Sequence, residues 1–260
     1  MSHSSPPPLD TLIRHLHQRR GRERRGLALA EGVRLVEEAL AARVRVRAAA
    51  LAPALEATPR GQALASALRE RSERVEQRGD RELASLAATD HPQGVIAVIE
   101  PPRWRLDDLQ LDVRSVVVVL DAVQDPGNVG TMVRTAWALG AAGLIALPGT
   151  AELTNPKVLR ATMGGFFRLP AIATGFEDAT DWLRRQGVRV WVSAGDGDRV
   201  TPAPADRPLA LVVGNEAAGV RDELRAAAER RIAIPLRPGA ESLNVAVAAG
   251  ILMYEVLRER

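Results

Sequence analysis

Apolar residues in the first hundred positions follow two periods, and each period predicts its own kind of element. In "LALAEGVRLVEEALAA" (27–42) an extended start leads into apolar positions spaced three and four apart, which predicts an amphipathic helix. The apolar positions of this helix are Val33, Leu35, Val36, Ala39 and Leu40. "VRVRAAAL" (44–51) alternates instead and predicts a strand. Similar patterns predict helices at 61–71 and 81–87, and strands near Val75 and at 94–100.

From residue 114 onward, unbroken apolar runs alternate with helical patterns. The runs predict strands at 115–120, 143–147, 169–174, 189–193, 208–213 and 231–235. The helical patterns lie at 129–139, 156–163, 178–186, 222–230 and from 242 to about 258. Apolar strands separated by helices predict an α/β fold with a mostly parallel sheet covered by helices on both faces.

These patterns divide the chain into two predicted domains. We expect a small α/β domain at 9–100, a linker rich in prolines and acids at 101–113, and a larger α/β domain at 114–260. The polar start, residues 1–8, predicts a disordered tail. No apolar run approaches the roughly 20 residues of a membrane span, and the chain has no cysteine. These features favour the cytoplasm.

The basic residues are almost all arginine. Of the 35 lysines and arginines, only Lys157 is a lysine. The segment "RHLHQRRGRERR" (14–25) carries six arginines. Such a block is either a solvated basic surface or the electrostatic footprint of nucleic-acid binding, because guanidinium groups bind phosphate well. The candidate RNA contacts in this block are Arg19, Arg20, Arg22, Arg24 and Arg25.

Parallel sheets bind ligands beyond the carboxyl ends of their strands, so the strand exits are the candidate sites. At the first exit, 121–130, Asn128 is a predicted N-cap and Arg134 follows it on the helix. At the second, 148–155, the next helix carries Lys157 and Arg160 on one face, which suits an anionic partner. Taken one at a time, both exits also fit ordinary capped helices with solvated cations.

The third and fourth exits combine glycine with amide and carboxylate side chains. Gly214 ends an apolar strand and is followed by Asn215 and Glu216, so the backbone there can approach a ligand closely. At the fourth exit, 236–244, Ser242 is a predicted N-cap and Asn244 lies in the first turn. The helix beyond is apolar almost all round, which predicts deep burial.

Several common chemistries lack their residues here. All four histidines precede residue 100, so the larger domain offers no histidine for a Ser-His relay or a zinc site. No GxGxxG follows a strand, and no phosphate-loop motif occurs. A reaction in this domain must rely on Arg, Glu, Asn, Ser and backbone groups, and transfer from a strongly activated donor suits that set.

Taken together, the exits resemble a known family. "LDAVQDPGNVGTMVRTAWALGAAG", "NPKVLRATMGGFFRLP", "LVVGNEAAGV" and "IAIPLRPGAESLNVAVAAGILMYE" are similar to the successive motifs of the SpoU (TrmH-like) branch of SPOUT RNA methyltransferases. Residues 9–100 resemble the substrate-binding domain of many members, whose α/β fold is of ribosomal-protein type. The resemblance implies S-adenosylmethionine as cofactor with no metal, a deep trefoil knot, a homodimer, and methylation of a ribose 2′-hydroxyl in RNA.

The resemblance also implies roles for residues. The catalytic positions are Asn128, Arg134, Glu216, Ser242 and Asn244. The cofactor-binding positions are Gly214, Asn215, Ile234, Leu236 and Leu243. Arg134 is either the base or, because an arginine pKa lies above about 12, the group that binds phosphate and the developing alkoxide. Trp137 and Thr162 depart from the acidic residue and the serine that are common in the family.

The fused first domain favours 23S rRNA as the substrate. The alternatives are ribose methylation of tRNA, methylation of a base, and a non-catalytic RNA-binding or assembly factor that retains the fold.

Overall fold

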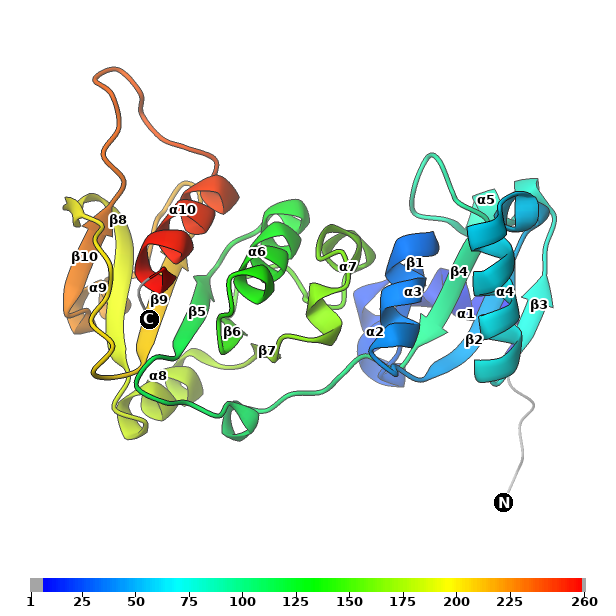
Figure 1. The fold of residues 1–260 in the computed structure, drawn as a ribbon, viewed down its shortest axis with the longest axis horizontal. Helices are drawn as coiled ribbons and strands as arrows, with labels where there is room; N and C mark the ends of the chain where they lie inside the picture. The colour runs from blue at the N-terminus through cyan, green and yellow to red at the C-terminus, as the bar shows by residue number, and fades with distance from the viewer. Residues whose placement is uncertain (1–6, 259–260) are drawn as a thin grey trace. The chain divides into compact units, whose positions relative to one another are not determined.

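The computed structural model describes residues 7–258, which fall into two compact units (Figure 1). The first unit contains the described residues up to Pro102 together with Thr154–Phe167. The second contains Arg103–Leu153 and the chain from Arg168 onward. The units differ from the predicted division in that Thr154–Phe167 folds with the first. Most of the predicted tail lies outside the described residues, but Pro7 is placed, and its carbonyl accepts a hydrogen bond from Arg74 at 3.3 Å.

The first unit is built on a four-stranded sheet in the order β1-β4-β2-β3. Its strands are β1 (Ala28–Glu31), β2 (Val46–Leu51), β3 (Val75–Gln77) and β4 (Val95–Ile99). β4 runs antiparallel to both β1 and β2, and β2 is parallel to β3. The helices are α1 (Leu9–Leu16), α2 (Arg19–Arg25), α3 (Val33–Ala41), α4 (Pro59–Arg71), α5 (Asp80–Leu86) and α7 (Pro156–Ala161), with short 3₁₀ turns at Pro53–Ala57 and Gly165–Phe167.

Two helices of the first unit were not predicted, α1 and α2. Leu9, Ile13 and Leu16 recur at helical spacing on α1 and pack into a core with Leu29 and Val98 of the sheet. The arginines that follow obscured this apolar face, because they make the segment as a whole read as basic surface.

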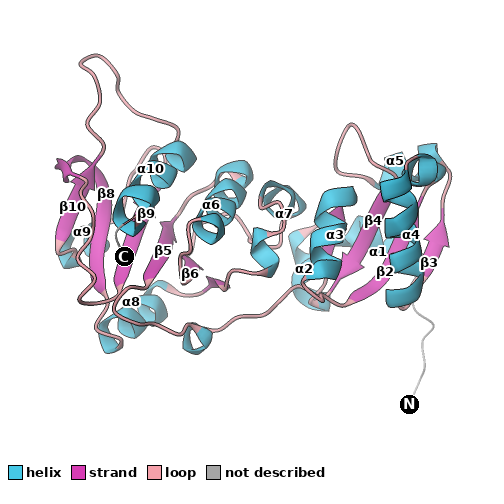
Figure 2. Cartoon of the chain, in the orientation of Figure 1, coloured by secondary structure: helices cyan, strands magenta, loops and turns pink. Residues whose placement is uncertain are grey.

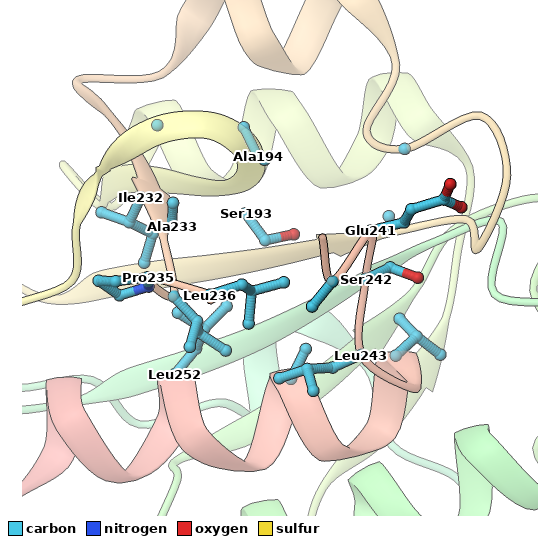
Figure 3. Close-up of a pocket in the computed structure, with 18 of the residues that line it drawn as sticks. Ser193, Ala194, Ile232, Ala233, Pro235, Leu236, Glu241, Ser242, Leu243 and Leu252 are labelled. Carbon is cyan, nitrogen blue, oxygen red and sulfur yellow. The ribbon is translucent and has the colours of Figure 1, made fainter. Parts of the chain in front are cut away.

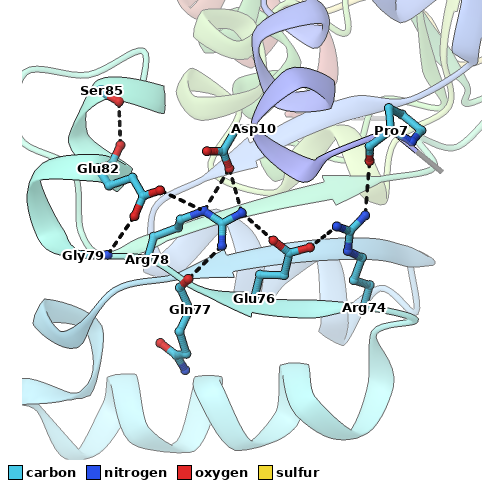
Figure 4. A network of polar contacts seen from close by, with 9 residues as sticks. All are labelled: Pro7, Asp10, Arg74, Glu76, Gln77, Arg78, Gly79, Glu82 and Ser85. Atoms are coloured by element: carbon cyan, nitrogen blue, oxygen red, sulfur yellow. Dashed lines mark hydrogen bonds and ion pairs between the residues drawn. The ribbon is translucent and has the colours of Figure 1, made fainter. Parts of the chain in front are cut away.

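Arginines also hold the first unit together (Figure 4). Arg78, just after β3, donates from Nε to Asp10 of α1 at 2.9 Å and pairs with Glu76. The hydrogen bonds that Arg78 donates to Glu76 and Asp10 raise the pKa of Arg78 above its ordinary value. Arg74 pairs with the other carboxylate oxygen of Glu76. These arginines therefore tie α1 to the edge strand β3.

The second unit contains a six-stranded sheet, entirely parallel, in the order β10-β8-β9-β5-β6-β7. Its strands are β5 (Val116–Asp121), β6 (Gly143–Ala146), β7 (Ala171–Ala173), β8 (Arg189–Arg199), β9 (Leu209–Gly214) and β10 (Arg230–Ala233). Its helices are α6 (Pro126–Ala138), α8 (Phe176–Arg185), α9 (Asp222–Ala227) and α10 (Val245–Leu257). The predicted α/β class with a parallel sheet is confirmed (Figure 2).

Helices flank both faces of this sheet. Trp182 of α8 and Leu224 of α9 share a core with Val117, Val119 and Val212, which alternate along β5 and β9. The opposite face is covered by α6 and α10, which lie side by side (Figure 1).

The predicted linker packs against the second unit. Leu109 is buried, and Trp104, Leu106 and Leu111 pack on the core that contains Trp182. A short 3₁₀ helix, η2 (Leu106–Asp108), lies within this segment. The prolines and acids predicted its irregular backbone but not its apolar anchors.

The last helix, α10, is less buried than its composition predicts. Val247, Ile251 and Tyr254 form one stripe along it and are 52%, 38% and 54% exposed. The prediction of burial on all sides is therefore wrong for this stripe. Within residues 7–258, no helix is long and apolar enough to cross a membrane.

Candidate active site

A cavity of about 900 Å³ lies in the second unit at the carboxyl ends of β8, β9 and β10 (Figure 3). Its walls come from the end of β8, the turn after β9, the loop from Ile234 to Leu243, and the start of α10. Eight of the predicted site residues line it, namely Gly214, Asn215, Glu216, Ile234, Leu236, Ser242, Leu243 and Asn244. The third and fourth strand exits therefore form one hollow.

The turn after β9 folds back onto the strand end. Asn215 and Gly219 exchange backbone hydrogen bonds of 3.0 Å, which brings Gly219 and Val220 directly over Gly214. A Cβ on Gly214 would lie 2.2 Å from the carbonyl carbon of Gly219. Only glycine fits there, and its backbone is left at the cavity wall.

The side chain of Asn215 builds this turn. Its Oδ1 accepts from the backbone N–H groups of Ala217 and Ala218 at 2.9 Å each, and its Nδ2 donates to the carbonyl of Ala122 at 2.9 Å. Its side-chain hydrogen bonds are thus used inside the protein, and its predicted contact with a cofactor has to come from the backbone.

A buried carboxylate that sequence reasoning missed braces the same region. Asp121, at the end of β5, accepts from the backbone N–H and the Nε of Arg221, both at 2.8 Å. The guanidinium of Arg221 also stacks 4.6 Å from the ring centroid of Phe176. A charged residue closing the apolar run "VVVVL" was the available signal.

The end of β8 forms a further wall that was not predicted. Arg231 of β10 pairs with Val192, and the next residue, Ile232, pairs with Asp198, so 193–197 bulges out of the ladder. Ser193 and Ala194 of this bulge lie across the cavity from α10 (Figure 3). The predicted strand ends at 193. The small residues and two glycines of "SAGDG" are typical of a bulge and were the signal.

Three of the predicted catalytic side chains form one hydrogen-bonded row. Asn128 donates from Nδ2 to Oε1 of Glu216 at 3.0 Å and accepts at Oδ1 from Nδ2 of Asn244 at 3.1 Å. Their sequence separations are 88 and 116 residues. The row therefore joins the first, third and fourth strand exits.

Helix ends position this row, although not with the caps that were predicted. Asp125, not Asn128, caps α6, and its Oδ1 accepts from the backbone N–H of Asn128 at 2.8 Å. Asn244, not Ser242, caps α10, and its Oδ1 accepts from Ala246 and Val247. Both predicted caps are corrected: α6 begins after Asp125, and α10 begins after Asn244. At these helix starts the side-chain amides of Asn128 and Asn244 face each other.

Arg134 and Ser242 stand apart from the row. Arg134 is exposed on α6, and within the described chain no hydrogen bond or ion pair holds its guanidinium. One turn further on, Trp137 is 43% exposed, with the guanidinium of Arg168 5.7 Å from its ring centroid. Ser242 is exposed at the cavity wall. Arg134 is therefore available to an external anion.

Comparison with known proteins assigns the chain. A family model described as "SpoU rRNA Methylase family" matches residues 115–254, more than half of the chain. The chain belongs to the SpoU rRNA methylase family. A second model, described as "MRM3-like substrate binding domain", matches residues 12–97.

Relatives of this SpoU family member include "23S rRNA (guanosine(2553)-2'-O)-methyltransferase RlmP" of Bacillus subtilis, 38% identical over 66% of this chain and 68% of that protein. An AdoMet-bound rRNA methyltransferase from Sinorhizobium meliloti superposes with a TM-score of 0.86 at 32% identity, covering 98% of this chain and 96% of the other. The SpoU methyltransferase AviRb of Streptomyces viridochromogenes, in complex with AdoMet, gives 0.87 at 30% identity, covering 98% of both chains.

The basic block of this SpoU family member is not uniformly available to RNA. Arg22 is buried, at 4% exposure, and donates to the carbonyls of Leu16 and His17 at 2.8 Å each. Its prediction as an RNA contact is corrected, because its guanidinium caps α1 from inside the unit. Arg19 pairs with Glu23 on the surface. The other candidates differ in exposure: Arg20 and Arg24 are exposed and Arg25 is half-buried.

The second cationic pair, Lys157 and Arg160, lies on α7 in the first unit. Lys157 is exposed, whereas Arg160 donates from Nη1 to the buried carboxylate of Glu31 at 3.1 Å. Thr162, which departs from the family's serine, is buried, and its hydroxyl donates to the carbonyl of Leu159 at 2.7 Å. That departure keeps the hydroxyl contact. Among the described residues, no cluster of three or more His, Asp or Glu side chains could hold a metal.

Proposed function

We propose that this chain is an S-adenosylmethionine-dependent methyltransferase that methylates the 2′-hydroxyl of one ribose in 23S rRNA. The observation that carries the proposal is the junction of the cavity with the row Glu216–Asn128–Asn244, because Glu216 and Asn244 belong to both. A cofactor pocket that shares its wall with oriented polar side chains is what group transfer from an activated donor needs. The family assignment and the 2′-O-methyltransferase relatives support the same reaction.

The cavity residues fit the cofactor. Its volume of about 900 Å³ lies in the range of roughly 300–1,000 Å³ that is usual for ligand pockets of this class. The backbone at Gly214 and Asn215 and the side chains of Ile234, Leu236 and Leu243 would hold it. When bound, the cofactor supplies a methyl group already activated on a sulfonium.

The chain's own residues then orient the ribose. The side-chain amides of Asn128 and Asn244 are hydrogen-bonded to each other. Glu216 accepts from Asn128 with one carboxylate oxygen, which leaves its second oxygen for the substrate. We assign the row, with Ser242, to positioning the ribose hydroxyls.

Arg134 is assigned to the phosphate next to the target ribose and to the alkoxide that develops at the 2′-oxygen. A guanidinium stays charged at neutral pH and cannot accept a proton, so the proton that the 2′-hydroxyl loses on methylation goes to solvent water. Rates of Arg134→Lys and Arg134→Ala across pH test this assignment. We expect the alanine variant to be slower at every pH with the acidic limb of the profile preserved. Loss of that limb would instead make Arg134 the base.

The proposed activity is tested with 23S rRNA transcribed in vitro and S-adenosylmethionine carrying an isotopic label on the methyl group. Nuclease digestion and nucleoside mass analysis should find a single 2′-O-methylated nucleoside. Glu216→Ala should lower kcat and leave the transcript's binding unchanged. Label in a base would show base methylation instead of ribose methylation. Label in tRNA but not in 23S rRNA would show that tRNA is the substrate. Calorimetry without measurable cofactor binding would favour an assembly factor.

We also propose a homodimer, a knotted C-terminal segment and a cytoplasmic location. Support for the dimer comes from the exposed apolar stripe Val247, Ile251 and Tyr254 on α10, beside which α6 presents Trp137. Exposed apolar residues grouped on two adjacent helices are typical of a subunit interface. Sedimentation should give a dimer for the wild type and a monomer for Ile251→Asp. A monomeric wild type at micromolar concentration would refute the dimer.

A further inference from the structure

Three segments that are far apart in the sequence meet around one buried carboxylate in the first unit. Glu31, at the end of β1, is 3% exposed. It accepts from the backbone N–H groups of Ala88 and Thr89 at 3.0 and 3.2 Å, and from Nη1 of Arg160 at 3.1 Å. Glu31 lies in the range of the substrate-binding family model and Arg160 in that of the methylase model. One side chain thus bonds the loop 88–93 and the helix α7 to the sheet.

The surrounding contacts leave this arrangement little freedom. The far end of the loop is fixed by Gln93, whose Oε1 accepts from the backbone N–H of Val33 at 2.9 Å. Gly164, just beyond α7, has a φ of +93°, and a Cβ there would lie 2.5 Å from the Cβ of Glu38. The segment therefore packs tightly against α3, and no side chain fits between them.

Burial of a carboxylate is unfavourable unless it is paired and hydrogen-bonded. Glu31 satisfies that condition with three donors, two from a loop and one from a helix. No described catalytic or cofactor-binding candidate is among its partners. The three hydrogen bonds therefore fix the position of the loop relative to α7. The functional consequence depends on which residues these two segments expose.

What they present includes Lys157. Its ammonium is exposed and has no ion-pair partner among the described residues, and it is the chain's only lysine. It lies in the first turn of α7, where the helix dipole disfavours a cation. Its charge therefore does not stabilise the helix and is available to bind a phosphate outside the protein. Beside the Glu31 donors, Asp90 and His91 at the tip of the loop are also exposed.

We propose that Glu31 is a positioning residue for RNA, whose carboxylate fixes α7 against the loop 88–93 so that Lys157 and the loop tip form one docking surface for the RNA backbone. This inference rests on the proposed function, since it names where the first unit meets the substrate. Glu31 acts through Arg160 and the loop and does not contact the RNA itself.

The test is Glu31→Gln, because simple electrostatics and positioning predict opposite signs. Removing a negative charge should strengthen RNA binding if only charge matters. If Glu31 positions the surface, the KM for 23S rRNA should rise at least tenfold, while kcat at saturating RNA and the Kd for S-adenosylmethionine stay within twofold. The matched control is Glu37→Gln on α3, which changes the net charge equally but removes a surface pair with Arg60. Its RNA KM should stay within twofold of the wild type.

Arg160→Gln removes the same contact from the other side and serves where Glu31→Gln folds poorly. In the double variant Glu31→Gln, Arg160→Gln, the RNA KM should match that of Glu31→Gln alone, since Arg160→Gln removes one of the contacts that Glu31→Gln already disturbs. An unchanged or lower KM in both single variants overturns the inference. Additive effects in the double variant would also overturn it. If the wild type itself fails to methylate RNA, the proposed function fails first, and the two failures are distinguishable.

Discussion

Replacing Gly214 by alanine is the sharpest test of the cavity. Gly214 ends β9, where its backbone pairs with Asp121 of β5, and the turn that carries Glu216 folds directly over it. The added Cβ would lie 2.2 Å from the carbonyl carbon of Gly219 and 2.3 Å from the nitrogen of Val220. All of the close atoms belong to backbone, so no side chain can rotate away. The turn itself has to move.

The size of the effect follows from that displacement. Ordinary contact requires about 3.4 Å, so the turn must shift by roughly 1 Å, a change that overpacking measurements place at about 1–3 kcal/mol. The same shift lengthens the 3.0 Å hydrogen bond between Glu216 and Asn128. We therefore expect the Kd for S-adenosylmethionine to rise at least tenfold, which corresponds to about 1.4 kcal/mol. We also expect kcat to fall.

Isothermal calorimetry with S-adenosylmethionine measures the first effect, and methylation at saturating cofactor measures the second. The control is Gly79→Ala in the first unit, where a Cβ meets no atom within 4 Å and the backbone has an ordinary φ of −65°. Its cofactor affinity should equal that of the wild type. A Gly214→Ala protein that binds the cofactor within twofold of the wild type, with an unchanged melting temperature, would refute the proposed pocket.

Substitutions at three further positions test the cap of α10 and two ion pairs. Asn244→Ala removes the cap of α10, so it should lower the free energy of unfolding by about 1 kcal/mol and also lower kcat. Asn244→Asp should retain the cap and the melting temperature of the wild type. Its kcat should stay low, because aspartate lacks the Nδ2 donor to Asn128. Asp121→Asn leaves Arg221 without its carboxylate, and denaturant titration should find about 3 kcal/mol less stability, the lower end for a broken buried pair because Arg221 is partly exposed. The hydrogen bond from Arg60 lowers the pKa of Glu37 below its ordinary value, so the stability it adds is present at neutral pH and lost as pH falls through that lowered pKa. Melting curves of Glu37→Gln and wild type should therefore converge in acid, and a gap that stays constant would contradict the pairing.

The sequence predicted the larger sheet well because its signals are local. Each strand of the second unit contains a short apolar run, and each predicted run reappears as a strand, although β8 continues to Arg199, beyond its predicted end at 193. The strand exits were also predictable, because parallel strands must end at one edge. That rule was enough to bring Gly214, Glu216 and Asn244 to one cavity.

Other features could not be predicted because they depend on partners distant in the sequence. Whether Arg22 faces solvent or caps α1 depends on carbonyls that become available only when α1 packs on the sheet. The caps of α6 and α10 were misassigned because Asp125 and Asn244 were each as suitable as the residues chosen. Only the finished turn decides between them.

The hydrogen bonds that cap α6 and α10 also position the row Glu216–Asn128–Asn244. Asn244 uses Oδ1 to cap α10, which leaves Nδ2 as the atom that can reach Asn128. Asn128 is fixed in turn, because Asp125 holds its backbone N–H and its amide then spans Asn244 and Glu216. The groups that begin the two helices are thus the groups that orient the row Glu216–Asn128–Asn244. A substitution that loosens either helix start should disturb kcat before it disturbs the fold, since capping contributes about 1 kcal/mol while the sheet and its two cores remain intact.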